Sequence, residues 1–315
     1  METAVIILNW NGKRFLKSCF DSLLNQTYKD FRIIFVDNCS KDSSVDFIKK
    51  NYRKELKKIK ILQLNENTGF AKGNNEGIRE ALKDKKTKYV VTLNNDTIAN
   101  KDFLKELTKK AQNRNIGMVS SRILFLKDKK IDTLGLMLFK SGLFFDIKNE
   151  ANLKYLFCPC GCAALYKREL LEDIKLNNQY FDEDFFAYAE DADLGFRAVL
   201  RSWKCAYAEN AVVYHMHQAS SSRDFLVYHI ERNTIWAILR NMPGALFFRN
   251  LPWFILTRAA ILFKYLFKGK AHLIIKARLD VLKKLGKVLN ERKSIQKNKK
   301  IKNKDLNKSI SKRLF

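Results

Sequence analysis

Short apolar runs alternate with amphipathic helical segments through the first 120 residues of this chain. Apolar runs of this length are typical of strands that are buried on both faces of a parallel sheet. Strands are predicted at Ala4–Leu8, Phe31–Val36, Ile59–Leu64 and Tyr89–Leu93, and helices at Arg14–Asn25, Ser43–Tyr52, Gly73–Leu82 and Lys101–Asn113. Because a helix joins each strand to the next, the connections are right-handed crossovers. We therefore expect an α/β fold with a mostly parallel, Rossmann-like sheet flanked by helices.

Polar residues follow directly after every one of these strands. The carboxyl ends of parallel strands meet at one edge of a sheet, where ligands of such folds bind. The polar strand ends are Asn9-Trp10-Asn11, Asp37-Asn38, Asn65-Glu66-Asn67 and Asn94-Asn95-Asp96. Because all four strands end in polar residues, we predict a nucleotide site at this edge. A single polar strand end would not support that prediction.

The remainder of the chain divides into three parts. Residues 121–170 hold short apolar pieces with Gly135 and Gly142 as turn points, which predicts a mixed or antiparallel part of the same sheet. A helix is predicted from Glu190 to Ser202, and strands at Cys205–Ala208 and Ala211–Tyr214. The pattern is helical from Asp224 to about Leu289, and residues 292–315 form a Lys- and Asn-rich tail that we expect to be frayed.

The basic charge is concentrated at the carboxyl-terminal end. The chain of 315 residues has a formal net charge of +27, and residues 240–315 hold 21 Lys and Arg but only 3 Asp and Glu. A charge of this size raises the hypothesis of a nucleic-acid-binding protein. That hypothesis leaves the polar strand ends unexplained.

The basic segment is also rich in apolar residues. Leu246–Phe267 is the nearest approach to a membrane span, but Arg249, Arg258 and Lys264 interrupt it. Farther on, a helical wheel gathers lysines within one arc opposite an apolar side; they are Lys276, Lys283, Lys284 and Lys287. Such helices are typical of proteins that lie on an anionic membrane surface. The alternative is a helical subdomain that packs on the core and has a solvated basic face.

The first residues carry no secretory signal pattern, so we expect a cytoplasmic protein whose 6 cysteines are thiols. Cys158, Cys160 and Cys162 lack the two-residue gaps of zinc sites. We interpret them as small packing residues.

Two of the polar strand ends suggest specific chemistry. Asp37 can accept the imide N–H of uracil or thymine, although alone it is as well explained as a turn residue. A bound diphosphate needs a hard divalent cation such as Mg²⁺ or Mn²⁺, and Asp96 can supply one carboxylate to it with Asn94 and Asn95 beside it. His215 ends a later strand and can complete a metal shell or contact phosphate, with His217 as its competitor.

Carboxylates and aromatic residues are mixed in the segment from Asp182 to Leu194. Glu190 and Asp191 fall at a predicted helix start, where the helix dipole favours ionised carboxylates. Such a carboxylate can serve as general base toward an acceptor hydroxyl. Arg197 is placed to pair with Asp193 four residues before it.

Taken together, these segments resemble the family 2 glycosyltransferases of the GT-A fold, in particular their rhamnosyltransferase-like branch. The resemblance covers about residues 4–222 and rests on motifs in the family's order. They are Val5-Ile6-Ile7-Leu8-Asn9-Trp10-Asn11, Leu23-Leu24-Asn25-Gln26-Thr27, Val36-Asp37-Asn38 with Ser40 and Asp42, Asn65-Glu66-Asn67-Thr68-Gly69-Phe70-Ala71-Lys72-Gly73-Asn74-Asn75 with Gly77, Leu93-Asn94-Asn95-Asp96, Gly161-Cys162-Ala163-Ala164, Glu190-Asp191-Ala192-Asp193-Leu194 with Arg197, and His215.

The resemblance implies a role for each matching residue. Asp191 would be the catalytic base with Glu190 supporting it, and Asp96 and His215 would hold the metal. The Asn-Asn-Asp motif has one carboxylate fewer than the family's Asp-x-Asp. The donor nucleotide would contact Asn9, Trp10, Asp37, Asn67, Gly69, Asn74 and Asn95, and the acceptor would lie at Gly161 and Asp193.

The function expected from this resemblance is an inverting, metal-assisted transfer of a sugar, rhamnose or a hexose. The donor would be a dTDP- or UDP-sugar, and the acceptor a hydroxyl of a lipid-linked saccharide or polysaccharide at the inner face of the cell membrane. Residues 1–222 would form the catalytic domain, with the donor half at 1–120 and the acceptor half at 121–222. Residues 223–291 would be a membrane-associating helical extension, and residues 292–315 a flexible basic tail.

Two alternatives belong to other classes. Sugar-phosphate nucleotidyltransferases have a similar sheet but a Gly-rich loop after the first strand, where this chain has only Gly12. A nucleic-acid-binding protein is the alternative without catalysis.

Overall fold

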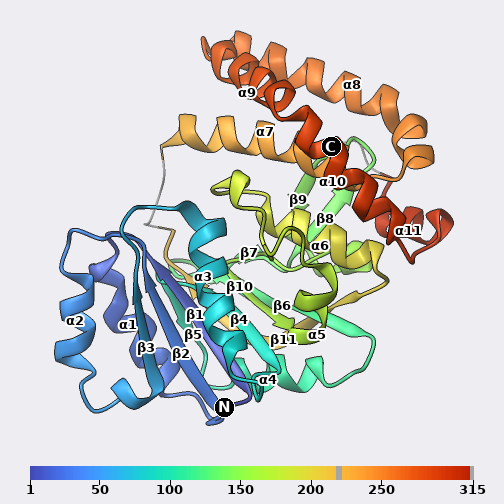
Figure 1. Ribbon diagram of the computed structural model, residues 1–315. Helices are drawn as coiled ribbons and strands as arrows, with labels where there is room; N and C mark the ends of the chain where they lie inside the picture. Colours follow the sequence, from blue (N-terminus) through green and yellow to red (C-terminus); the bar gives the residue numbers. More distant parts are fainter. Residues whose placement is uncertain (218–221, 313–315) are drawn as a thin grey trace.

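The computed structural model describes residues 1–217 and 222–312 and has a central twisted sheet beneath a layer of helices (Figure 1). The first half confirms the predicted alternation. Its elements are β1 (Thr3–Asn9), α1 (Lys13–Leu24), β2 (Phe31–Asp37), α2 (Ser44–Asn51), β3 (Ile59–Gln63), α3 (Gly69–Lys83) and β4 (Tyr89–Asn94). β1 lies between β2 and β4 and is parallel to both, and β3 is parallel to β2. The carboxyl ends of these strands therefore lie at one edge.

The second half of the main sheet mixes strand directions, as the sequence predicted. It contains β5 (Thr97–Ala99), β6 (Ile116–Phe125), β7 (Ile131–Thr133), β10 (Ala163–Lys167) and β11 (Lys204–His215), with α4 (Phe103–Ala111) between β5 and β6. β10 is antiparallel to both β4 and β6, and β11 is parallel to β6. The two strands predicted at 205–214 are one strand, interrupted by a register shift between Ala208 and Val212.

One part of the sheet prediction was wrong. The segment with Gly135 and Gly142 does not extend the main sheet, because β8 (Leu136–Phe139) pairs with β9 (Phe144–Asp146) in a small separate sheet. The third strand of that sheet is β12 (Ile310–Ser311) from the far end of the chain. No local pattern could show a partner about 170 residues away in the sequence.

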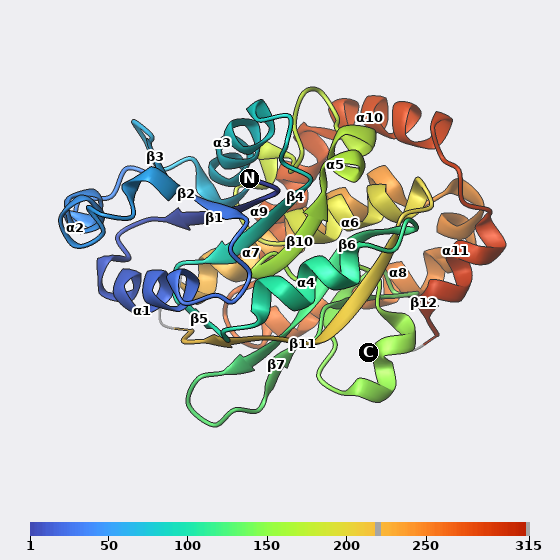
Figure 2. The same ribbon diagram turned by 90° about the horizontal axis from the view of Figure 1, so that it is seen from below.

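Two apolar layers cover the two faces of the main sheet. α1, α2 and α4 supply the buried residues on one face. α3, α5 (Arg168–Ile174) and α6 (Glu190–Leu200) supply them on the other. Figure 2 shows α3 and α5 on one side of the strands and α1 and α4 on the opposite side. Short 3₁₀ turns lie at Leu56–Lys58, Glu150–Tyr155 and Glu183–Phe185.

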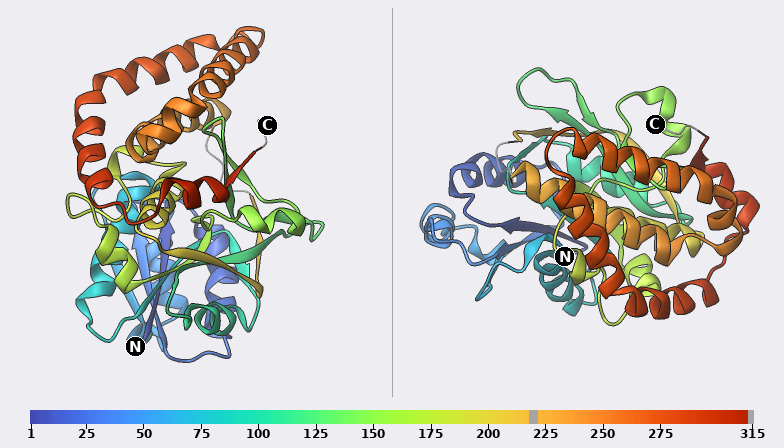
Figure 3. Two further views of the ribbon diagram at one scale, coloured as in Figure 1. Left: turned by 90° about the vertical axis from the view of Figure 1, so that its right-hand side faces the viewer. Right: turned by 90° about the horizontal axis from the view of Figure 1, so that it is seen from above.

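From Arg223 to Ser309 the chain is mainly helical and forms a separate layer next to α6. It consists of α7 (Arg223–Asn241), α8 (Gly244–Leu266), α9 (Ala271–Lys283), α10 (Leu285–Lys297) and α11 (Asn303–Ser309). Figure 1 and the left view of Figure 3 show α8 and α9 on the outside of this layer, away from the main sheet.

The expectation of a frayed tail at 292–315 was wrong for its described part, which ends at residue 312. α10 continues to Lys297, and Leu306 and Ile310 are buried in the apolar core. The backbone N–H groups of Lys300 and Ile301 donate to the carbonyl of Leu200. Apolar side chains spaced among the lysines thus anchor the segment, although its average composition is that of a solvated tail.

The predicted arc of lysines was also wrong in part. α9 ends at Lys283 and α10 begins at Leu285, so the four lysines do not lie on one continuous helix. Lys284 and Lys287 remain exposed but are directed at Asp184, with which both form ion pairs.

Candidate active site

The polar strand ends form one hydrogen-bonded group, because β1 is paired in register with β2 and places Asn9 beside Asp37. The side-chain NH₂ of Asn9 donates to Asp37 Oδ1 at 3.2 Å and to Ser40 Oγ at 3.0 Å. Asn95, which follows β4, donates to Asn9 Oδ1 at 2.7 Å. Three residues predicted to bind nucleotide are therefore brought together at the edge of the sheet.

Asp37 and Trp10 differ greatly in exposure. The Asp37 side chain is buried and also accepts the Ser40 N–H at 3.0 Å, so it orders the turn after β2 while each oxygen keeps a second lone pair. Trp10 is 56% exposed at the end of β1. An exposed aromatic ring such as Trp10 can stack on a flat base, and a carboxylate such as Asp37 can accept a hydrogen bond from the edge of that base.

Asn67 and Gly69 form the turn that leads into α3. Asn67 Oδ1 accepts from the Gly69 N–H at 3.0 Å and from the Asn38 amide at 2.9 Å. Gly69 has φ +77°, which a side chain rarely tolerates. Asn74 is placed differently from the prediction, because it is buried and its NH₂ donates to the Phe70 carbonyl within α3. It supports the helix and does not line the open edge.

The predicted metal ligands come together through a strand pairing. β5 follows Asp96 directly and is antiparallel to β11, with Thr97 opposite His215. This pairing places His215 Nε2 3.2 Å from Asp96 Oδ1. A buried carboxylate and an imidazole nitrogen at this separation fit two ligands of a divalent cation.

Two further residues adjoin this pair: Asp132, which the sequence analysis did not assign to the site, and His217, which it named as the competitor of His215. Asp132 Oδ2 lies 3.1 Å from His215 Nδ1 and 2.6 Å from His217 Nε2. Asp132, His215 and His217 form a group whose ligand atoms are close enough to share one ion. No signal in the sequence marks Asp132, because it reaches the site through the pairing of β7 with β6.

Asp132 determines which nitrogen of His215 faces Asp96. Burial alone would lower the pKa of His215, but its contacts with Cys162 and with the carboxylates of Asp132 and Asp96 raise it. A cation held by Asp96 would take the place of a proton on Nε2, while an Nδ1–H would donate to Asp132. Second carboxylates in this arrangement orient histidine ligands of metals.

Asp191 lies in the first turn of α6, as predicted. Its Oδ2 accepts the Gly161 N–H at 2.8 Å, and its Oδ1 accepts the Ala192 N–H at 2.7 Å. Burial raises the pKa of Asp191 to about 6, even though these two N–H groups oppose the shift. The Gly161 carbonyl accepts from Thr92 on β4, so the base lies near the strand that leads to Asp96.

Glu190 is buried beside Asp191, and its Oε2 has no hydrogen-bond partner among the residues that the structure describes. Burial, followed by the charge of Asp191, raises the pKa of Glu190 well above its usual range. Of the two neighbouring carboxyl groups, Asp191 is therefore the one that ionises first.

The assignment of Asp193 to the acceptor site was wrong. Its side chain is fully buried and pairs with Arg197 at 3.0 Å, as the four-residue spacing predicted. It also pairs with Arg240 at 2.6 Å and accepts from Asn241 at 2.6 Å. Burial alone would raise the pKa of Asp193, yet Arg240 and Arg197 hold it below its usual value. These partners enclose the carboxylate and keep it away from a substrate.

The cysteines act as packing residues, as expected. Cys158 is fully buried and touches α6 so closely that a Cβ on Gly195 would lie 2.1 Å from its own. Burial raises the pKa of Cys158, Cys160 and Cys162, which keeps them as thiols. Within residues 1–217 and 222–312, the candidate metal group contains no cysteine.

Comparison with known proteins gives consistent results. The family model of glycosyl transferase family 2 matches residues 4–175. Poly(ribitol-phosphate) β-N-acetylglucosaminyltransferase TarS of Staphylococcus aureus is 25% identical over 68% of this chain and 35% of its own length. A poly(ribitol-phosphate) β-glucosyltransferase of Bacillus spizizenii is 26% identical over 69% of this chain and 32% of its own. The chain thus spans about a third of the length of these relatives.

Solved structures show the same fold. TarS residues 1–349 with UDP-GlcNAc superpose with a TM-score of 0.57 at 20% identity, covering 78% of this chain and 68% of that one. The mannosyltransferase PcManGT of Pyrobaculum calidifontis, with GDP-Man and Mn²⁺, gives 0.57 at 17% identity and covers 94% and 84%. The predicted GT-A fold is confirmed, while the rhamnosyltransferase-like branch stays a prediction. Because the family model spans more than half of the chain, the protein belongs to glycosyl transferase family 2.

Proposed function

We propose that this protein transfers a hexose from a nucleoside-diphosphate sugar to a hydroxyl group of a polyol or saccharide polymer, with inversion at the anomeric carbon. The observation that carries the proposal is Asp191, a partly buried carboxylate that Gly161 holds beside the nucleotide edge with a pKa raised to about 6. A single carboxylate of this kind suits a single displacement. A double displacement needs a second carboxylate as nucleophile.

The chain's own residues supply most of the chemistry. Asp191 accepts the proton of the acceptor hydroxyl as its oxygen forms the new bond to the anomeric carbon and the bond from that carbon to the diphosphate breaks. The Gly161 N–H holds the carboxylate in place. Asp96 and His215 would hold a divalent cation, which supplies positive charge to the departing diphosphate when bound.

A UDP-sugar is the donor that we favour. TarS was solved with UDP-GlcNAc, and both poly(ribitol-phosphate) relatives are named as transferases of glucose-type sugars. A dTDP-sugar would present the same imide edge to Asp37, so a dTDP-linked rhamnose is the second donor to test. Mg²⁺ and Mn²⁺ both suit the Asp96 carboxylate, and PcManGT was solved with Mn²⁺.

We further propose that the protein works at a membrane surface, on a lipid-linked or membrane-associated acceptor. The outer helices expose large apolar side chains: on α8, Phe248, Ile255, Leu256, Phe263 and Leu266, directly after it Phe267, and on α9, Ile275, Leu279 and Leu282. Apolar residues at this density, within a segment of net basic charge, fit the interface of an anionic bilayer.

α8 is the one helix among the described residues that is long and apolar enough to cross a membrane, and 22% of its apolar window is buried. The sequence analysis did not count it as a span because of its basic residues. One of these, Arg258, is buried and pairs with Glu231 of α7 at 2.8 Å. We therefore favour α8 lying along the surface, with Arg258 turned to the protein and Phe248 and Phe267 to the lipid.

The test of the proposed function is a transfer assay with UDP-GlcNAc, UDP-glucose and dTDP-rhamnose in the presence of Mn²⁺ or Mg²⁺. Asp191→Asn keeps the size of the side chain but cannot take the proton, so we expect turnover to fall by about 10²–10⁴-fold. Donor affinity, measured by calorimetry, should stay the same. Exposed Asp30→Asn is the control. Unchanged turnover in Asp191→Asn would exclude Asp191 as the base, and a retained anomeric configuration in the product would exclude inversion.

A further inference from the structure

The loop that leads into the Glu190–Asp191 turn has an unusual backbone. Phe186, Tyr188 and Ala189 have φ of 64°, 70° and 63°, in a region that residues with a side chain rarely adopt. Such conformations persist only where the surrounding structure holds them in place. Because Ala189 is the residue that precedes α6, this loop fixes where the helix begins and where Asp191 stands.

One side chain of the C-terminal layer contacts most of the loop. Asn233 of α7 is fully buried, and its two side-chain N–H groups are shared among the carbonyls of Phe185 at 3.0 Å, Ala187 at 2.9 Å and Tyr188 at 2.7 Å. The left-handed residues turn these carbonyls toward a single point. An amide that donates there gives the carbonyls of Ala187 and Tyr188 a partner, while the Phe185 carbonyl also accepts from the Ala187 N–H.

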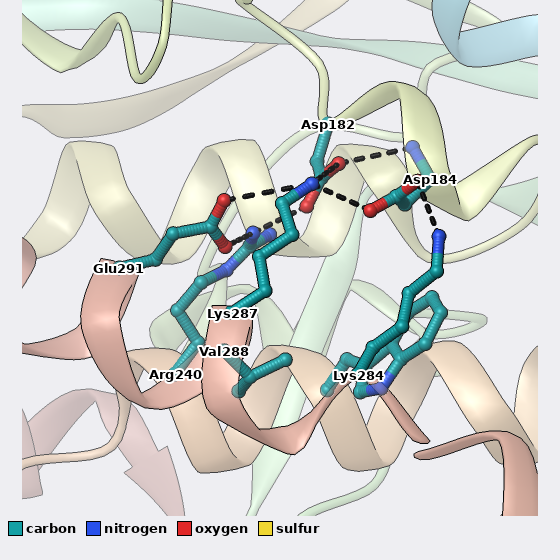
Figure 4. Close-up of a pocket in the computed structure, with 8 residues that line it drawn as sticks. Asp182, Asp184, Arg240, Lys284, Lys287, Val288 and Glu291 are labelled. Atoms are coloured by element: carbon teal, nitrogen blue, oxygen red, sulfur yellow. Dashed lines mark hydrogen bonds and ion pairs between the residues drawn. The ribbon is translucent and has the colours of Figure 1, made fainter. Parts of the chain in front are cut away.

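Neighbouring side chains hold the start of the same loop. Arg232 donates from Nη2 to the carbonyls of Asp184 at 2.9 Å and Phe185 at 3.0 Å. Figure 4 shows Arg240 between Asp182 and Glu291, and Lys284 and Lys287 directed at Asp184. Arg240 also pairs with Asp193, two residues after Asp191. The loop and the first turn of α6 are thus held from the same side, by α7 and α10.

We propose that α7 completes the catalytic site, with Asn233 as the residue that positions Asp191. The inference rests on the proposed role of Asp191 as base. Asn233 acts through the loop and not on the substrate. When its donor is removed, the left-handed loop relaxes and Asp191 moves relative to Gly161, while the nucleotide edge formed by β1, β2 and β4 is unaffected.

The experiment compares Asn233→Asp with the wild-type full-length chain. The substitution keeps the size of the side chain and an acceptor for Arg232 but removes the donated hydrogens. We expect kcat to fall by about 10–100-fold while donor affinity changes by much less, since the base is displaced and the loop touches the donor edge at the turn into α3 rather than at β1, β2 or β4. Hydrogen exchange should increase in residues 185–192 and stay unchanged in β1. Ile238→Val, another buried position on α7, is the matched control and should lower Tm without lowering kcat.

Arg232→Met is the second variant in case Asn233→Asp does not fold, and it should give the same kcat loss and the same local exchange. Wild-type kcat in a variant whose loop exchange has increased would overturn the inference. A parallel loss of donor affinity would overturn it as well, because it would show general disruption of the fold.

If Asp191→Asn is inactive and Asn233→Asp is fully active, this inference fails and the proposed function stands. If Asp191→Asn is active, the proposed function fails.

Discussion

At the scale of single residues, the behaviour of Asp191 is decided by competing effects. The helix dipole and two N–H donors favour its ionised form, as the sequence position suggested. Burial outweighs them and raises the pKa of Asp191 to about 6. A base of this pKa is ionised at neutral pH and is still a stronger proton acceptor than an exposed aspartate.

The first prediction concerns the pH dependence of transfer. Because the base must be ionised and its pKa is raised to about 6, activity is lost as pH falls below that value and is full above it. We expect kcat/KM to fall by about tenfold per pH unit on the acid side of this limb. The measurement is a pH profile at saturating cation. A limb at the pKa of an ordinary aspartate, about 4, would contradict the burial argument.

At the scale of elements, the site depends on contacts between segments that are distant in the sequence. β5 and β11 place Asp96 beside His215, and the turn into α3 touches the loop before α6. The Ala71 N–H donates to the Phe186 carbonyl, and a Cβ on Gly69 would lie 2.5 Å from that oxygen. The turn that leads from β3 into α3 and the loop that precedes Asp191 are therefore packed against each other.

The second prediction follows from that contact. Gly69→Ala combines a left-handed φ with a clash against backbone, and we expect it to cost about 1–3 kcal/mol more in unfolding free energy than a φ penalty alone. Gly269→Ala is the matched control, because Gly269 has φ +65° and no described atom lies within 4 Å of where its Cβ would stand. Chemical denaturation of both variants measures the difference. Equal losses of unfolding free energy in the two variants would show that the loop at Phe186 shifts to accommodate the new Cβ without a free-energy cost.

At the scale of the whole molecule, the C-terminal helices have two sides with different tasks. Their inner side carries the ion pairs that hold the loop at 182–184. Their outer side exposes apolar residues of α8 and α9. A truncation near Met242 would remove Glu291 and Lys287 together with the exposed residues, so point variants separate the two tasks better than truncation does.

The third prediction tests the outer side. The double variant Phe248→Ser and Phe267→Ser changes side chains that are 71% and 86% exposed, so the fold should be unaffected. If each ring is buried in the bilayer, its loss weakens binding by about 1.5–3 kcal/mol. Co-sedimentation with phosphatidylglycerol vesicles should fall sharply, while Phe145→Ser on β9 should bind as the wild type does. Equal sedimentation of all these proteins would reject the outer side as the membrane contact.

The sequence by itself determined the parallel half of the sheet, the order of its helices and most of the nucleotide edge. Strands buried on both faces and helices with one apolar face are local patterns, and in-register parallel pairing then fixes that Asn9, Asp37 and Asn95 meet. The positions of Asp191 and His215 followed for the same reason, as residues at the start of a helix and the end of a strand.

Only the tertiary structure decided what each charged group touches. Asp132 joins the metal group through β7, and Asp193 is the partner of Arg240 instead of the predicted acceptor contact. Lys284 and Lys287 form ion pairs with Asp184. The apparent tail folds because Leu306 and Ile310 find apolar partners on other elements. The pKa of Asp191 belongs to this level too. Burial and long-range ion pairs depend on where distant segments pack, and no local pattern of residues contains that information.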